Sequence, residues 1–257
     1  MITNREILNI AMQQSAIDLS AKESDFEKNE NVIVLSEKNE NARKYLTLPF
    51  SCQLVSYGNN IVASVSPEYR EITENYIKKY PTEHCFETPH MHILNEALMK
   101  QGQKICFMAE YFLPDINSLR ELKCGYELRV LNRDDFSELY LKEWSNALCE
   151  KRKELDVLAV GAYDGHRLIG LAGASADCEN MWQIGVDVLP EYRKMGVASA
   201  ITSRLAIEIF KHGKIPFYCA AWSNVGSVRN AIRSGFRPAW VEMTAKPIAL
   251  VDKMNRR

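Results

Sequence analysis

The sequence lacks the features that mark several large classes of protein. Its 257 residues have a formal net charge of −1, so no excess of positive charge indicates a nucleic-acid-binding surface. No apolar run reaches the roughly 18 residues that a membrane-spanning helix needs, and the N-terminal segment has charged residues where a signal peptide would be apolar. We therefore expect a cytoplasmic protein with no nucleic-acid partner and no membrane partner.

Cysteine is present but is not arranged for disulfides or for a zinc finger. The seven cysteines are scattered and include no CxxC pair, so reduced thiols packed as small apolar groups are the simplest interpretation. Two alternatives stay open around Cys85: a zinc site shared with His84, His90 and His92, or a catalytic cysteine beside a histidine. Because no second group of ligands follows at finger spacing, we predict no metal.

The common phosphate-binding loops are also missing, since the chain has neither GxxxxGK followed by Ser or Thr nor GxGxxG. A different phosphate signal is present in LPEYRKMGVASA, where a strand over Trp182–Val188 ends and a long helix over Arg193–His212 is predicted. The first turn of a helix has N–H groups without partners, and a glycine lets an anion approach the backbone. The segment around Gly196, with two basic residues before it, therefore predicts a diphosphate site.

Strands and helices alternate through the second half of the chain. The predicted elements around the long helix are strand Tyr126–Leu131, helix Asp134–Leu141, a polar segment at Glu143–Glu154, strand Phe217–Ala221, helix Val225–Ser234 and strand Ala239–Thr244. Two apolar runs joined by Asp164-Gly165 predict a type I′ hairpin turn. This order predicts an α/β (α+β) fold with a mixed sheet. Turn residues near Cys124-Gly125 put the boundary with a smaller N-terminal α/β domain between 1–123 and 124–257.

Two segments of this second domain resemble the GCN5-related N-acetyltransferase (GNAT) superfamily. VDVLPEYRKMGVASAITSRL is similar to the coenzyme motif of that family at Val188, Pro190, Arg193, Gly196 and Ala198. NVGSVRNAIRSGFRPAW is similar to a second family element at Asn224, Ser227, Gly235 and Phe236. The two come in the family's order, separated by a helix and a strand. The resemblance covers about half of the chain and implies the GNAT acyl-CoA acyltransferase fold for 124–257.

The resemblance also implies a co-substrate, acetyl-CoA, and the residues that bind it. Backbone amides of the coenzyme motif would hold the pyrophosphate; these belong to Arg193, Lys194, Met195, Gly196, Val197, Ala198 and Ser199. The pantetheine arm would pair like an extra strand with Val186, Asp187 and Val188, where a splay from the next strand leaves groups unpaired. Asn224 would hydrogen-bond the pantetheine, and Ser227 would lie near the sulfur.

The implied reaction is transfer of an acetyl group to a primary amine of a small molecule or peptide by direct attack. Many family members have a tyrosine that serves as the general acid at the position where this chain has Ala231. Tyr218, Ser227 or a water could replace it, or the reaction could have no dedicated acid. Glu179 is our predicted base, and Asp187 is an alternative. Two other functions stay open: a non-catalytic acyl-CoA-binding sensor, which the missing tyrosine favours, and an aminoacyl- or longer-chain acyltransferase.

The first half of the chain contains an echo of the coenzyme motif. Val65–Arg70 repeats the pattern of Val188–Arg193, but Thr73 stands where Gly196 would fall. One interpretation is that each segment simply begins a helix with a proline and an acid. The other is that the first half is a degenerate GNAT-like copy, as in two-part acetyltransferases of the zwittermicin-resistance type, which the general layout resembles. In either case we expect it to shape the acceptor pocket or a homodimer surface, not to bind coenzyme.

Overall fold

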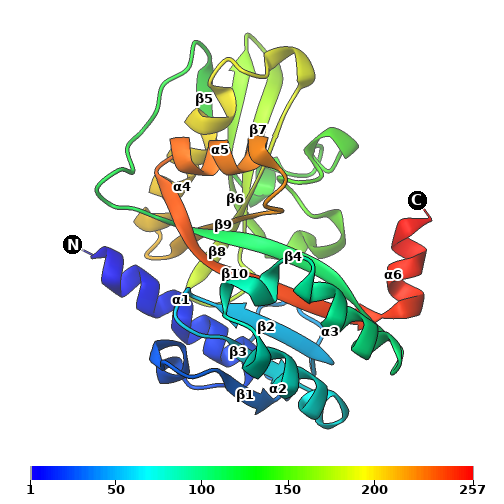
Figure 1. The fold of residues 1–257 in the computed structure, drawn as a ribbon. Helices are drawn as coiled ribbons and strands as arrows, with labels where there is room; N and C mark the ends of the chain where they lie inside the picture. The colour runs from blue at the N-terminus through cyan, green and yellow to red at the C-terminus, as the bar shows by residue number, and fades with distance from the viewer. Residues whose placement is uncertain (1, 257) are drawn as a thin grey trace. The chain divides into compact units, whose positions relative to one another are not determined.

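The computed structural model describes residues 2–256, which divide into two compact units (Figure 1). Unit 1 contains residues 2–8 and Tyr111–Pro238, and unit 2 contains Asn9–Glu110 and residues 239–256. This division does not follow the predicted boundary after residue 123, because the chain enters unit 1 along β4 (Gln103–Pro114) and leaves it along β10 (Phe236–Pro247). The C-terminal segment therefore belongs to the same unit as most of the first half of the chain.

Unit 1 is built on a mixed sheet with the strand order β9-β8-β7-β6-β5. Its strands are β5 (Glu127–Asn132), β6 (Asp156–Asp164), β7 (Arg167–Ser175), β8 (Met181–Val188) and β9 (Ile215–Ala220). Neighbours from β5 to β8 are antiparallel, whereas β9 runs parallel to β8. The predicted α/β fold with a mixed sheet is confirmed.

The hairpin between β6 and β7 is confirmed, with a correction to its turn. Asp164 pairs with Arg167, so the turn consists of Gly165 and His166. Gly165 has a φ of +61°, while neither Asp164 nor His166 has a positive φ. A type I′ turn needs a positive φ at both central residues, so the predicted turn type is wrong although the hairpin is correct.

Two helices, α4 (Val197–Lys211) and α5 (Val225–Arg233), cover one face of this sheet. Apolar residues of α4, among them Val197 and Ile201, share a core cluster with Ile184 of β8 and Ala172 of β7. Burial of this stripe supplies the main stabilisation of the helix, since apolar contact area removed from water is the dominant favourable term in folding. The helix predicted over Arg193–His212 is confirmed from Val197 onward.

The opposite face of the sheet is covered by the segment between β5 and β6. This segment forms three short 3-10 helices at Arg133–Asp135, Lys142–Trp144 and Glu150–Leu155, so the α-helix predicted over Asp134–Leu141 is wrong. Its apolar side chains are anchored in a second core cluster against Ala159 and Leu171; they are Phe136, Trp144, Ala147 and Leu148. Tertiary packing of these side chains overrides the local helical pattern.

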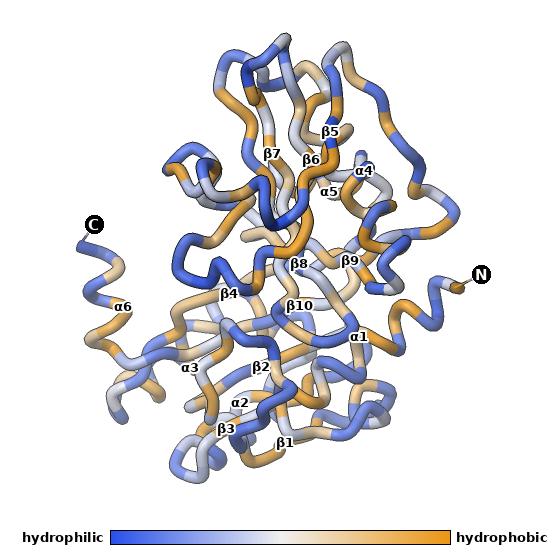
Figure 2. Tube along the Cα trace, turned by 180° about the vertical axis from the view of Figure 1, so that it is seen from behind, coloured by the Kyte–Doolittle hydropathy of each residue, from blue (hydrophilic) through white to orange (hydrophobic). Residues whose placement is uncertain are grey.

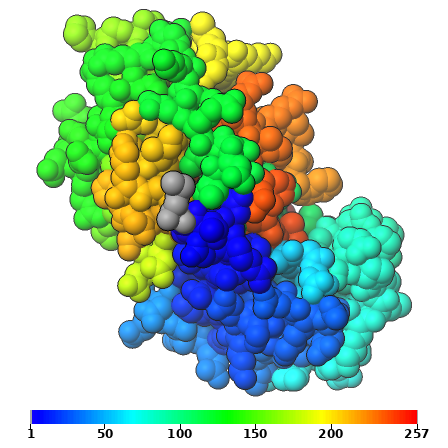
Figure 3. Space-filling model, turned by 90° about the vertical axis from the view of Figure 1, so that its left-hand side faces the viewer, coloured from blue at the N-terminus to red at the C-terminus, as the bar shows by residue number. Residues whose placement is uncertain are grey.

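Unit 2 contains strands in the order β1-β3-β2-β10-β4, with parallel and antiparallel neighbours. Its other elements are β1 (Val32–Leu35), β2 (Cys52–Ser56), β3 (Val62–Val65), α2 (Arg70–Lys79), α3 (His90–Met99) and α6 (Ile248–Asn255). The helix α1 (Asn4–Leu19) begins in unit 1 and continues into unit 2. Polar and apolar residues alternate along α1 (Figure 2). The core cluster of this unit packs Leu54 of β2 and Met243 of β10 against Ile77 and Leu94 of the helices. In Figure 3 its blue-to-cyan residues form a continuous surface on the face shown.

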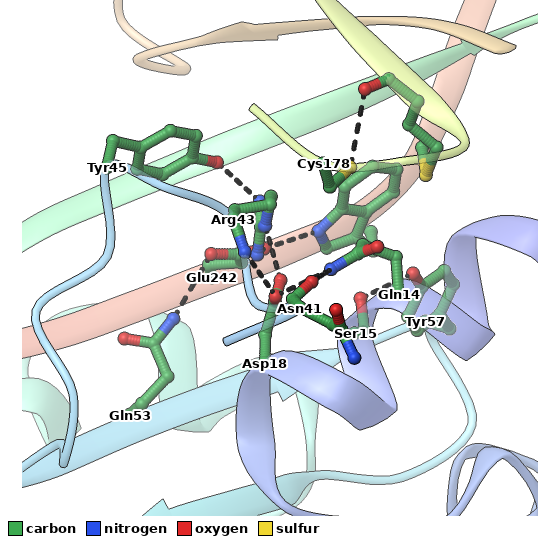
Figure 4. A network of polar contacts seen from close by, with 12 residues as sticks. Gln14, Ser15, Asp18, Asn41, Arg43, Tyr45, Gln53, Tyr57, Cys178 and Glu242 are labelled. Atoms are coloured by element: carbon green, nitrogen blue, oxygen red, sulfur yellow. Dashed lines mark hydrogen bonds and ion pairs between the residues drawn. The ribbon is translucent and has the colours of Figure 1, made fainter. Parts of the chain in front are cut away.

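A buried ionic network lies inside unit 2 (Figure 4). The guanidinium of Arg43 donates to the carboxylate of Asp18 and, over 2.6 Å, to that of Glu242. The three side chains are only 4%, 2% and 5% exposed. Further donors reach the same carboxylates, including Trp240 Nε1 at 2.8 Å from Glu242 and Gln14 Nε2 at 2.9 Å from Asp18. Buried charges are tolerated when they are paired and hydrogen-bonded in this way.

None of the helices in residues 2–256 combines the length and the apolar character that a membrane span requires.

Candidate functional site

The open edge of β8 is the first component of the site. On one side, β8 pairs with β7 as far as Val188, which lies opposite Gly170. On the other side, pairing with β9 ends at Ile184, opposite Tyr218. The backbone from Gly185 to Val188 therefore has no partner strand on its β9 side, at the position where the resemblance implied a splay. An extended ligand can add to such an edge as a further strand.

The loop after β8 turns the chain sharply into α4. A short 3-10 helix, Pro190–Tyr192, ends at Arg193, whose backbone is extended with ψ of 157°. Lys194 and Gly196 then adopt left-handed backbone conformations, with φ of +63° and +82°. Two features favour glycine at position 196. A positive φ strains residues that have a Cβ, and a Cβ here would occupy open space through which a ligand can approach the backbone.

The first turn of α4 presents backbone N–H groups. The backbone bond from Ala200 N–H to Gly196 O, at 3.0 Å, closes the first turn. The N–H groups of Val197, Ala198 and Ser199 precede it and have no partner within the helix. Because the helix dipole adds positive potential at this end, these amides and the left-handed glycine form an anion cradle.

The start of α5 contributes further residues to the site. Asn224 caps the helix, since its Oδ1 accepts the N–H of Ser227 at 3.2 Å. This capping role was not predicted for Asn224; its side-chain nitrogen is not used by the cap. Arg229 and Arg233 lie four residues apart on the same side of α5, so both guanidinium groups face the same region.

These elements enclose a pocket of about 860 Å³ in unit 1. Eleven of the twelve predicted coenzyme-binding residues line it: Val186, Asp187, Val188, Arg193, Lys194, Gly196, Val197, Ala198, Ser199, Asn224 and Ser227. The twelfth, Met195, is not among the lining residues and is 53% exposed. Four cationic side chains border the pocket, at Arg193, Lys194, Arg229 and Arg233, as an anionic ligand requires.

The family model of the GNAT acetyltransferases matches residues 57–239, well over half of the chain. The chain belongs to the GNAT acetyltransferase family. The match includes both motifs that carry the resemblance and extends into unit 2. A search of curated proteins finds no match.

Solved structures similar to this GNAT protein come from several bacteria. A putative GNAT-family acetyltransferase from Novosphingobium aromaticivorans is 18% identical with a TM-score of 0.45, over 56% of this chain and 66% of that one. A GCN5-related N-acetyltransferase-like protein from Streptococcus suis is 19% identical with a TM-score of 0.45, over 62% and 69%. A tandem GNAT protein from the clavulanic acid biosynthesis pathway is 16% identical with a TM-score of 0.41, over 63% and 59%. The chain thus spans about two thirds or less of these proteins.

One position of α5 departs from the GNAT pattern described above. Ala231, at the position of the family tyrosine, is fully buried in the core of unit 1. Tyr218 of β9 lines the pocket instead, and its hydroxyl lies 2.7 Å from Ser227 Oγ in a hydrogen bond. Burial raises the pKa of Tyr218, so its phenol stays protonated near neutral pH. The structure therefore brings together two of the side chains considered as replacements.

The two predicted bases occupy different environments. Glu179 is exposed, lies between β7 and β8, and is not among the residues that line the pocket; its catalytic role stays a prediction without geometric support. Asp187 lines the pocket, but its carboxylate accepts hydrogen bonds from the backbone of Asn146 and Ala147. These bonds engage the carboxylate of Asp187 in holding the Asn146–Ala147 backbone.

Several pocket residues were not identified from the sequence. Arg229 and Arg233 had a signal, because their spacing after the Asn224 cap sets them on one side of the predicted helix. Asn146 had none, because it lies in the polar segment predicted only as such and reaches the pocket through long-range packing.

The two alternatives that involve Cys85 receive no support in unit 2. Cys85 is fully buried, its thiol lies 3.7 Å from the carbonyl oxygen of Tyr80, and burial raises its pKa to about 11. Among the described residues, one group could hold a metal ion, and it joins His84 and His90 to Glu87, not to Cys85. The expectation of no metal stays a prediction.

Proposed function

We propose that this GNAT protein transfers an acetyl group from acetyl-CoA to a primary amine of a small molecule or peptide by direct attack. The observation that carries the proposal is the continuity of one pocket. It joins the open edge of β8, the left-handed turn at Gly196 and the unpartnered amides of α4. Family membership agrees with this reading.

The residues present fit coenzyme A. The amides of Val197, Ala198 and Ser199 would hold the pyrophosphate beneath Gly196, whose missing Cβ leaves the approach open. The cationic side chains of Arg229 and Arg233 would face the remaining phosphate. The Gly185–Val188 edge would pair with the pantetheine amides. When bound, acetyl-CoA supplies an activated acetyl thioester with a fairly good thiolate leaving group.

The chain's own groups would assist the transfer in two ways. A backbone N–H on the open edge of β8 would stabilise the negative charge that develops on the carbonyl oxygen under attack. The Tyr218 hydroxyl, held by Ser227 Oγ at 2.7 Å, would give its proton to the leaving sulfur. The amine must lose a proton before or during attack, and water is the simplest carrier because the pocket is open to solvent.

A second candidate, an acyl-CoA-binding sensor without turnover, is favoured by one observation. The chain has Ala231 at the position of the tyrosine that many GNAT enzymes use as their general acid. Ala231 is fully buried, so this position presents no proton donor to the pocket. The sensor would use the same cradle and would release its ligand unchanged.

Thiol release from acetyl-CoA, measured across a panel of primary amines, separates these candidates. The panel should include a diamine, an aminoglycoside and a lysine-containing peptide. We expect amine-dependent release by the wild-type chain at rates well above the rate without amine. Tight binding of acetyl-CoA by calorimetry with no amine-dependent release would favour the sensor, and the absence of both would reject the site assignment.

A further inference from the structure

The two faces of β8 meet different parts of unit 1. Side chains alternate along a strand, and Ile184, Val186 and Val188 belong to the core cluster that contains α4. Gly185 and Asp187 must therefore face the opposite side, where the segment between β5 and β6 lies. A group that approaches the open edge from this second side would meet residues that the coenzyme cradle does not include.

A pair of glycines lets the segment between β5 and β6 reach the sheet. Gly173 of β7 and Gly185 of β8 are direct partners across the two strands. A Cβ at Gly185 would overlap with the carbonyl oxygen of Asn146, and a Cβ at Gly173 would overlap with that of Ala147. Both neighbours are backbone atoms, so a flexible side chain could not give way. The Asn146–Ala147 backbone therefore lies directly on the sheet, and only glycine permits it there.

Asp187, two residues beyond Gly185, holds this segment in place. Its Oδ2 accepts the backbone N–H groups of Asn146 at 2.8 Å and Ala147 at 3.0 Å. Its Oδ1 accepts Asn146 Nδ2 at 2.6 Å. Because a carboxylate only accepts, it fixes which end of the Asn146 carboxamide faces it. The side-chain oxygen of Asn146, Oδ1, receives no hydrogen bond from any described residue and is therefore available to a ligand.

Charge is unevenly distributed around the pocket. Among the described residues that line it, Asp187 is the single carboxylate, against the four cations at Arg193, Lys194, Arg229 and Arg233. Arg229 and Arg233 belong to α5, which packs on the α4 side of the sheet. Phosphates are therefore favoured on the α4 side, whereas a positively charged amine is favoured where Asp187 and Asn146 lie.

We infer that Asn146 is the acceptor-binding residue, its side-chain oxygen receiving an N–H of the incoming amine, and that Asp187 is the positioning residue that aims it. Gly173 and Gly185, which have no side chain, allow the Asn146–Ala147 backbone to lie against the sheet. The substrate class is an amine that arrives as a cation, reaching the open edge of β8 from the face opposite α4. This inference rests on the proposed acetyl transfer.

The test uses Asn146→Ala and Asp187→Asn in the full chain, with the amine that the wild type turns over best. We expect the KM for the amine to rise about ten- to a hundredfold in both variants, since a hydrogen bond to a charged group is lost. The Kd for acetyl-CoA, by calorimetry, and the melting temperature should stay close to the wild-type values. Such a split would not arise from general loss of structure.

Two matched controls accompany these variants. Glu143→Gln removes an exposed carboxylate from the same segment, three residues before Asn146 and outside the pocket lining, and should leave the amine KM unchanged. Gly185→Ala should also raise the amine KM, but it should lower the melting temperature as well, because its Cβ would overlap with the Asn146 carbonyl oxygen. Gly125→Ala, where a Cβ meets nothing within 4 Å, should have no effect.

The outcomes separate this inference from the proposed function. Unchanged amine KM in Asn146→Ala and Asp187→Asn, with an active wild type, would overturn the inference alone. The inference would also be overturned if, in these variants, the Kd for acetyl-CoA rose by the same factor as the KM for the amine. That result would show that Asn146 and Asp187 support the whole pocket and not the amine alone. No turnover by the wild type on any amine would remove the proposed function and this inference with it.

Discussion

Units 1 and 2 each contain a strand followed by the tripeptide Pro-Glu-Tyr, and the two segments diverge directly after it. Pro67–Tyr69 and Pro190–Tyr192 both form a 3-10 helix. Arg70 then continues in helical conformation, with φ −58° and ψ −54°, into α2. Arg193 is extended instead, with φ −70° and ψ 157°, and the chain breaks before α4. The break, not the shared tripeptide, creates a second helix start with free amides.

The position that follows the echo shows the consequence. Thr73 is fully buried inside α2 and its hydroxyl bonds to the carbonyl oxygen of Tyr69 at 2.8 Å. Gly196 stands at the mouth of an open pocket. The strands differ as well: every residue of β3 is paired with β1 on one side and β2 on the other, whereas β8 is open beyond Ile184. Unit 2 thus has neither an anion cradle nor an edge for a pantetheine arm at its echo.

The largest expected effect comes from breaking the cradle. Gly196→Glu should abolish acetyl-CoA binding, because the new side chain combines a strained positive φ with negative charge and bulk in the phosphate space. Gly213→Glu is the matched control, since Gly213 also has a positive φ (+68°) and open surroundings, at the other end of α4. Calorimetry should show binding lost in the first variant and kept in the second. Wild-type affinity in Gly196→Glu would refute the cradle.

The next effect concerns stability and the buried charges of unit 2. Arg43→Met should lower the free energy of unfolding by about 3–5 kcal/mol, because it leaves Asp18 and Glu242 buried without their cation. Arg129→Met in unit 1 removes the partner of Glu127 in a pair that is 41% and 60% exposed, and should leave the free energy of unfolding close to the wild-type value because solvent screens exposed ion pairs. Urea unfolding would compare the two; equal small losses would mean that the network contributes little.

A smaller effect tests the chemistry of unit 1. Tyr218→Phe should lower kcat for amine acetylation about ten- to a hundredfold while acetyl-CoA affinity stays unchanged, since a thiolate needs only modest help to leave. Tyr163→Phe, on β6 and outside the pocket lining, serves as the control. Burial raises the pKa of Tyr218, so its phenol keeps its proton at every pH below the ordinary pKa of tyrosine. Over that pH range, deprotonation of Tyr218 should cause no fall in the kcat of the wild type. An unchanged kcat in Tyr218→Phe would assign the proton to Ser227 or water.

Local sequence signals could predict the cradle but not the other wall of the pocket. Gly196 stands after a strand and before a helix, so adjacent residues determine its role. Asn146 depends on Gly173 and Gly185, whose missing side chains matter only once β7 and β8 are paired. The helix expected over Asp134–Leu141 failed for the same reason, because contacts with Leu171 decide that segment's shape. Long-range packing leaves no local pattern to read.

The smallest expected effect sharpens the comparison at its central position. Thr73→Val keeps the shape of the side chain and removes its hydroxyl bonds to Tyr69 O and Cys52 Sγ, so it should cost about 1 kcal/mol of stability. Acetyl-CoA affinity should not change, whereas Gly196→Val at the matching position of unit 1 should weaken it at least about tenfold. Thr73→Gly should not create a second coenzyme site, because β3 is paired on both sides. Two bound acetyl-CoA molecules per chain in that variant would show that the glycine alone makes the cradle. One bound molecule per chain would show that glycine alone is insufficient, and that the break after Arg193, the open edge of β8 or both are needed as well.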